Sequence, residues 1–227
     1  MAPTQIGVSL QFDWTVIIGV MPELLRGAGV TLYITAGGLL GGLTLGLFIG
    51  LLRAYAPKFV NALAFAYVEA IRGTPIVVQV MFIYFALPLL IGLRVDPMTA
   101  AFTAIIINAS AYIAEIVRGA FLSVPNGLKE AGLAMGLPMW KVLVFVLGPV
   151  AFRRLIPPLG NQCIVSLKDT SLFIVIGVGE LTRTGQEIMA TNFKAVEVWA
   201  AVAVLYLIMT GFLSAALRFT ERRAKIL

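Results

Sequence analysis

The sequence predicts an all-α polytopic membrane protein, and three observations support that fold class. Of the 227 residues, 60% are hydrophobic and only 12% are charged. A soluble domain carries about twice that fraction of charged residues. The mean hydropathy is strongly positive, at +0.98. The apolar residues also form long runs, several of them of the length of about 20 residues that a helix needs to cross the hydrocarbon core.

Five crossings are expected, within a single transmembrane domain that covers residues 1–227. They span residues 27–52, 59–93, 98–121, 155–178 and 195–217. The second run contains Gly73-Thr74-Pro75, where Pro75 lacks an N–H and disfavours the α conformation at Thr74, so one kinked crossing is expected. Phe12-Asp13-Trp14 is expected to anchor an interfacial segment before residue 27, and residues 179–194 to form a polar link.

Glycines recur at every fourth residue of the first run, at Gly38, Gly42, Gly46 and Gly50. This spacing allows a second helix backbone to approach closely. The pattern does not identify the partner, so packing within the same subunit and packing on a second copy are equally open.

Lys and Arg are divided unevenly between the two sides that five crossings create. One side holds Arg26, Arg94, Arg183 and Lys194. The other holds Arg53, Lys58, Arg118, Lys129, Lys141, Arg153, Arg154, Arg218, Arg222, Arg223 and Lys225. Because basic residues accumulate on the cytoplasmic side, the N-terminus is expected outside and the C-terminus in the cytoplasm. Topology accounts for the net charge of +6, and no nucleic-acid surface is needed.

A polar, helix-forming segment within residues 123–158 interrupts the apolar sequence. Its first helix, residues 127–135, is roughly 14 Å long at about 1.5 Å per residue, too short to cross a bilayer, so it is expected at the surface. Glu130 is placed in its first turn, Gly136 is expected to end it in a left-handed conformation, and Pro138 begins a second helix. Small residues leave one side of the first helix without bulk, which suits close docking to a partner.

Glu130-Ala131-Gly132, then Gly136, and finally Val146-Leu147-Gly148-Pro149 form a spaced pattern in this segment. The pattern resembles the signature loop of the permease subunits of bacterial ATP-driven importers, which reads E-A-A, three residues, G, and ends in I-x-L-P. Gly132 stands in place of the usual third Ala and Gly148 in place of the Leu, and neither change adds bulk. The stretches 69–79, 111–119 and 166–172 are similar to the polar amino acid branch of these permeases. The runs IRGTPIVVQVMFIYFALP and KDTSLFIVIGVGELTR and the tail ERRAKIL are similar to its glutamine permeases.

This resemblance implies the transmembrane domain of a type I ABC importer in the bacterial inner membrane. It implies a cytoplasmic coupling loop over residues 123–149, in which coupling to a separate ATPase is assigned to Glu130, Ala131, Gly132, Gly136 and Pro149. The expected partners are a second permease copy in a homodimer, a dimer of cytoplasmic ATP-binding subunits and a periplasmic amino acid binding protein. L-glutamine is the expected substrate, with arginine, histidine or glutamate as alternatives. The chain is expected to be non-catalytic and to bind no cofactor, since ATP and Mg belong to the partner ATPase.

Charged residues within or near the hydrocarbon form a second group of candidates. They are Glu69, Arg72, Glu115, Lys168 and Asp169, and Gln79 joins them from the matched stretch. An Arg, Lys or Asp at a helix centre costs about 2.5–3.5 kcal/mol on insertion scales, so these groups are expected to face protein or water. Glu69 and Arg72 are three residues apart and can pair. Two interpretations remain open: pairing between helices, or a translocation path in which a zwitterionic amino acid presents its own charges.

Other functional classes fit the residues less well. An ion channel or ion-coupled carrier needs a selectivity element or inverted repeats, and neither is evident in the hydropathy of the two halves. An intramembrane enzyme lacks its usual groups, because the chain has no His, a single Cys (Cys163, expected to be a small buried residue) and no G-x-S-x-G turn. No G-x-x-x-x-G-K-[ST] phosphate-binding loop occurs either, so the energy of active transport must come from another subunit.

Overall fold

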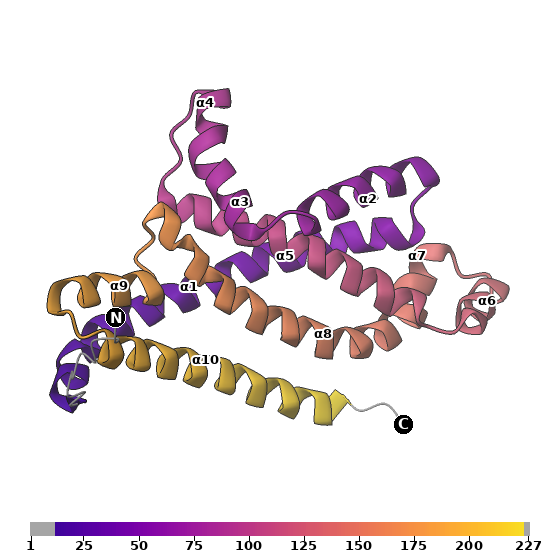
Figure 1. Ribbon diagram of the computed structural model, residues 1–227. Coiled ribbons are helices and arrows are strands. Elements are labelled where there is room, and N and C mark those ends of the chain that lie inside the picture. Colours follow the sequence, from indigo (N-terminus) through magenta and orange to yellow (C-terminus); the bar gives the residue numbers. More distant parts are fainter. Residues whose placement is uncertain (1–11, 225–227) are drawn as a thin grey trace, which may run out of the picture.

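The computed structural model describes residues 12–224, with side chains to residue 220, and these residues are helical apart from short links (Figure 1). The expected interfacial segment over residues 1–26 therefore lies partly outside the described residues. The helices in chain order are α1 (Trp14–Tyr55), α2 (Lys58–Arg72), α3 (Ile76–Met81), η1 (Phe82–Ala86), α4 (Leu87–Ile91), α5 (Pro97–Leu122), α6 (Asn126–Ala134), α7 (Met139–Lys141), η2 (Val142–Leu147), α8 (Gly148–Asp169), η3 (Thr170–Ile176), α9 (Leu181–Asn192) and α10 (Ala195–Ala224).

The described residues contain four or five candidate membrane spans, against the five expected. Four helical stretches are each long and apolar enough to cross a membrane, and α2 with α3–α4 adds a fifth if this bent pair is one span. In Figure 1 the start of α1 and α9 lie at one end of the bundle, whereas α6, α7 and the last turns of α10 lie toward the other. The first and last described residues thus lie toward opposite ends, which an odd number of crossings requires.

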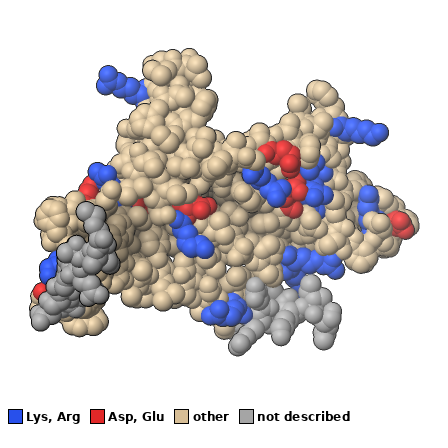
Figure 2. Space-filling view, viewed as in Figure 1, with Lys and Arg blue, Asp and Glu red and all other residues tan. Residues whose placement is uncertain are grey.

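Most of the surface in the view of Figure 2 carries no charge, and the charged side chains gather in a few clusters. Many large apolar side chains are exposed, among them Leu89 at 86% and Phe212 at 74%. In a soluble protein such a surface is unfavourable, but toward lipid or an apolar partner it costs little.

The glycines of α1 form its interface with α5 in the same subunit. A Cβ built at Gly38, Gly42, Gly46 or Gly50 would lie 2.3–2.8 Å from the nearest atom of Ile105, Ala109, Ile113 or Val117 respectively. Such distances are well below van der Waals contact, so the two backbones approach closely only because these positions have no side chain. Of the two open interpretations of this ladder, packing within the subunit is the one observed.

The second passage is broken rather than kinked. α2 and the helical stretch Ile76–Ile91 meet at 98°, across the residues Gly73, Thr74 and Pro75. The second half projects from the body of the bundle, as α4 does in Figure 1. The sequence predicted the position of the interruption correctly, but it underestimated the angle.

Two of the prolines in helices closely follow a π-helical turn. η1 precedes Pro88, and η2 precedes Pro149. A proline removes the hydrogen bond to the carbonyl four residues earlier and clashes with it, and a wider turn relieves that conflict. Gly148 is suited to this place because a Cβ there would lie 2.9 Å from the carbonyl oxygen of Leu143. The Leu expected from the resemblance would not fit this turn without a shift.

Three extents differ from the sequence prediction. The first helix begins at Trp14 instead of residue 27, with Asp13 accepting a hydrogen bond from the Thr15 N–H at 2.9 Å. The fourth runs from Met139 to Ile176, so most of the second half of the expected loop is continuous with a spanning helix. The expected polar link 179–194 contains the helix α9, which packs on α1 where Gly27 leaves room for Thr184. Hydropathy marks only the part of a helix within the hydrocarbon, so polar turns that extend it were missed.

Candidate functional site

A polar cavity of about 620 Å³ opens where the broken second passage meets α5 and α8. Its volume is in the range of about 300–1,000 Å³ that is typical of small-molecule sites. It is lined by Arg72, Gly73, Thr74, Pro75, Ile76, Asn108, Tyr112, Asn161, Gln162, Val165, Asp169 and Leu172. The residues of the break, Gly73, Thr74 and Pro75, form one wall of the cavity.

Both signs of charge line this cavity. Arg72, at the end of α2, lies with its guanidinium 5.4 Å from the centre of the Tyr112 ring and 4.0 Å from a Glu69 carboxylate oxygen. Asp169 ends α8 and has no hydrogen-bond or ion-pair partner among the described residues. A cation and a carboxylate that accepts no hydrogen bond from the described residues line one cavity, and this arrangement suits a ligand that carries both charges.

Amide side chains supply the other polar groups of the cavity. Asn108 comes from α5, and Asn161 and Gln162 come from α8, where Gln162 donates to Ser166 Oγ at 3.2 Å. The sequence analysis did not select these three. Asn108 could have been found as the amide that directly follows the apolar residues 104–107, but Asn161 and Gln162 lie in a stretch with many polar residues and have no such signal.

Two of the sequence candidates are near the cavity without lining it. Gln79 lies behind the break, donates to the carbonyl oxygens of Ile71 and Thr74, and accepts from Asn108. Lys168 is exposed on the surface of α8 and is absent from the lining, although Asp169 next to it lines the cavity.

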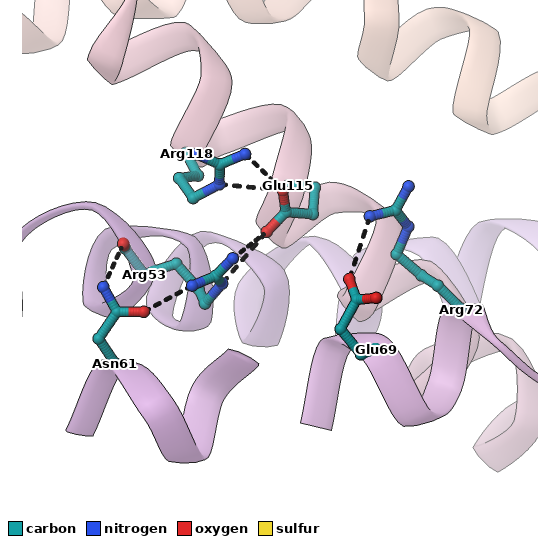
Figure 3. A network of polar contacts seen from close by, with 6 residues as sticks. All are labelled: Arg53, Asn61, Glu69, Arg72, Glu115 and Arg118. Atoms are coloured by element: carbon teal, nitrogen blue, oxygen red, sulfur yellow. Dashed lines mark hydrogen bonds and ion pairs between the residues drawn. The ribbon is translucent and has the colours of Figure 1, made fainter. Parts of the chain in front are cut away.

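Glu115 takes part in an ion-pair network at the α6 end of the bundle (Figure 3). Its carboxylate lies 3.1 Å from Arg53 of α1 and 2.8 Å from Arg118 of α5. Arg53 also donates to Asn61 of α2 at 2.5 Å and lies over the Phe65 ring. The Glu115 carboxylate thus joins α5 to α1, and Arg53 extends the network to α2; in Figure 3 this network is separate from the Glu69–Arg72 pair.

The surface helix α6 presents a small-residue face to the outside. It begins at Asn126, so Glu130 lies in its second turn instead of the expected first, with Glu130 and Ala131 exposed. Gly132 points inward, and a Cβ there would lie 3.0 Å from a Val142 methyl group. Gly136 has φ +76°, the expected left-handed conformation, with no atom within 4 Å of a built Cβ. Pro149 is exposed in the first turn of α8. It lies in the long helix Met139–Ile176, which is separated from the end of α6 by four residues.

Two contacts connect α6 to the spanning helices. Arg154 of α8 donates to the carbonyl oxygen of Ser123 and, at 2.8 Å, to its hydroxyl, which holds the link before α6. The Lys129 ammonium lies 5.8 Å from the centre of the Tyr55 ring at the end of α1. These contacts place α6 and the link before it against the ends of α1 and α8.

Glu180 is a buried carboxylate that the sequence analysis did not single out. It is 0% exposed, caps α9 by accepting from the N–H groups of Thr182 and Arg183, and accepts from the Tyr206 hydroxyl at 2.9 Å. Burial raises the pKa of its carboxyl, while these hydrogen bonds act in the opposite direction. It holds the α8–α9 link against α10. Within the described residues no group of three or more His, Cys, Asp or Glu side chains is arranged to hold a metal ion.

A bundle of four or five candidate membrane spans, a cavity lined by both signs of charge and a short surface helix packed against the spanning helices are the features of a membrane transport subunit of the permease type. Comparisons with known proteins agree with this class. Residues 42–226 match the family described as "binding-protein-dependent transport system inner membrane component". The chain belongs to this family.

Two relatives and one solved structure indicate the branch of the family. The glutamine transport system permease protein GlnP of Escherichia coli strain K12 is 58% identical, over 96% of this chain and 100% of that protein. The arginine transport system permease protein ArtQ of Bacillus subtilis strain 168 is 31% identical, over 95% of this chain and 99% of that protein. A crystal structure of an amino acid ABC transporter with histidines superposes with a TM-score of 0.86 at 34% identity, covering 93% of this chain and 98% of that one.

Proposed function

We propose that this chain is the permease subunit of an ATP-driven amino acid importer and that its substrate is L-glutamine. The observation that carries the proposal is the membrane cavity lined by Arg72, Asp169 and three amide side chains. The choice of glutamine rests on the 58% identity to GlnP over the whole length of that protein.

The cavity offers a complementary group for each part of a zwitterionic ligand. The Arg72 guanidinium presents parallel N–H donors that suit an α-carboxylate. The Asp169 carboxylate suits an α-ammonium, and the amides suit a side-chain carboxamide. Both charges of the ligand are then paired inside the membrane, which lowers the cost of taking a zwitterion out of water.

The proposed assembly contains two copies of this chain, two ATP-binding subunits and an external amino acid binding protein. Lys168 supports a second copy or a water-filled path beside α8, because an exposed cation on a spanning helix is costly in contact with lipid. The exposed face of α6, with Gly127, Ala131 and Ala134, is the surface that docks on the ATP-binding subunit. The division of Lys and Arg supports an external N-terminus and a cytoplasmic α6.

Reconstitution tests this function. The chain is placed in proteoliposomes with its cognate ATP-binding subunit and binding protein, and uptake of radiolabelled L-glutamine is measured. Uptake is expected to require both partners and ATP hydrolysis. Uptake by the permease alone, driven by a proton or sodium gradient, would refute the proposal and favour an ion-coupled carrier.

A further inference from the structure

A chain of hydrogen bonds behind the cavity fixes which atom Asn108 presents to it. The chain starts at the break of the second passage. Ile71 is four residues before Pro75, whose missing N–H removes the helical donor to the Ile71 carbonyl and leaves it only the long contacts from the Thr74 N–H at 3.4 Å and the Thr74 hydroxyl at 3.3 Å. Gln79 takes that place, since its Nε2 lies 2.7 Å from the Ile71 carbonyl oxygen and 3.0 Å from that of Thr74.

The orientation of the Gln79 amide follows from the chemistry of its partners. Backbone carbonyl oxygens only accept hydrogen bonds, so the atom of Gln79 that faces both of them must be the NH₂ nitrogen. Its Oε1 then points the other way, toward Asn108 at 3.2 Å. Gln79 is only 8% exposed and Asn108 only 6%, so water has little access to offer alternative partners at this junction.

The same reasoning passes to Asn108. Because Gln79 Oε1 is an acceptor, Asn108 must turn its Nδ2 toward Gln79, which turns its Oδ1 to the other side of the amide. Among the described residues Asn108 Oδ1 has no hydrogen-bond partner, yet every fully buried side-chain N or O has one. The Oδ1 atom is therefore accessible, and Asn108 lines the cavity.

We infer that Gln79 acts as a positioning residue that locks Asn108 with its carbonyl oxygen toward the cavity, so that this wall selects an N–H donor of the ligand and rejects an acceptor. This inference rests on the proposed function of the cavity. An amide that rotates freely offers either a donor or an acceptor and discriminates little. A locked Asn108 amide places its Oδ1 against a carboxylate oxygen when such a ligand binds, and two acceptors cannot form a hydrogen bond. Sites with a fixed hydrogen-bonding group reject analogues that leave this group unpaired.

The test is direct binding to the purified complex without binding protein, measured by calorimetry with three ligands. These are L-glutamine, L-glutamate, and glutaramic acid, which is glutamine without its ammonium group. If Asn108 Oδ1 accepts from the carboxamide, Asn108→Leu lowers the preference for glutamine over glutamate by tenfold or more. If it accepts from the ammonium, the same variant lowers the preference for glutamine over glutaramic acid instead. Either result supports an acceptor at Asn108.

Gln79→Met tests the locking step, because it has similar length and no amide. It is expected to lower the same preference as Asn108→Leu, whereas a merely structural defect would weaken all three ligands equally. Ser110→Ala serves as the control, since Ser110 is a buried polar residue of α5 that bonds Tyr67 and does not line the cavity. It should leave the preferences within twofold.

The outcomes separate the two proposals. If Arg72→Gln weakens binding of all three ligands but Asn108→Leu and Gln79→Met leave every preference unchanged, the inference fails and the cavity keeps its function. If Arg72→Gln also has no effect on binding, the proposed function of the cavity fails. Should Gln79→Met not assemble, Asn108→Leu alone still decides between an acceptor and no acceptor at this wall.

Discussion

Gly50→Ala is the sharpest test of how α1 and α5 pack. A Cβ at position 50 would lie 2.6 Å from Val117 Cβ and 2.7 Å from the backbone oxygen of Ala114. Neither atom is the end of a flexible side chain, so the variant cannot be accommodated by a rotamer change. The two helices must separate by roughly 0.9 Å to restore a contact near the usual distance of about 3.5 Å.

Overpacking of this kind costs about 1–3 kcal/mol. For a chain of this size each 1 kcal/mol corresponds to a fall in Tm of about 2–4 °C. We therefore expect Gly50→Ala in detergent micelles to unfold several degrees below wild type, measured by size-exclusion chromatography of heated samples.

Gly29→Ala on the same helix is the matched control. No atom lies within 4 Å of a Cβ at position 29, so this substitution adds helix propensity without a clash. Its Tm should equal or exceed that of wild type. If Gly50→Ala and Gly29→Ala have the same Tm, the α1–α5 contact is looser than described and the packing argument is refuted.

Three further predictions concern the network, the surface helix and the topology. Glu115→Ala leaves Arg53 and Arg118 close together without a counter-charge and should cost about 3 kcal/mol of stability. Glu69→Ala removes a half-exposed pair at 4.0 Å and should cost less than about 1 kcal/mol. Equal melting temperatures of the two variants would contradict this difference. Gly136→Val should reduce ligand-stimulated ATP hydrolysis by the complex, because the left-handed backbone at this position costs a β-branched residue about 1–2 kcal/mol of strain. Gly136→Asn should retain the activity, because Asn tolerates a φ of +76°. Equal activities of the two variants would refute the role of this conformation. In a Cys163→Ser background, the variant Arg94→Cys should react with an impermeant thiol reagent added from the periplasmic side. The variant Gly127→Cys should react only when the reagent is added from the cytoplasmic side. The reverse labelling pattern would contradict the expected topology.

Hydropathy predicted the long apolar helices because lipid imposes long apolar runs, and Pro75 marked the break because its missing N–H has a local effect. Helix ends were harder to predict. Trp14 and Met139 begin helices that continue beyond the hydrocarbon, where polar residues are as favourable as apolar ones. α9 was missed because its sequence, LTRTGQEIMATN, is mostly polar and is stabilised by contacts with α1 and α10 that depend on the tertiary fold.

The site was predictable where charge reveals it. Arg72 and Asp169 were selected from the sequence because an ionised group in an apolar run is costly. Asn108, Asn161 and Gln162 carry no charge, and only the fold brings them to the same cavity. Gln79 was selected among the path candidates, but the role inferred for it depends on the 98° break, whose angle no local pattern determines.

The most direct test of the central claim is L-glutamine uptake by complexes in which the cavity charges are removed singly. Arg72→Gln or Asp169→Asn removes a charge-assisted contact of about 1.5–3 kcal/mol, so uptake should fall by roughly 10-fold to 100-fold while assembly and basal ATP hydrolysis persist. Glu69→Gln, a neutralising change outside the cavity lining, should keep uptake within twofold of wild type. Wild-type uptake by both cavity variants would contradict the assignment of this cavity to the translocation path.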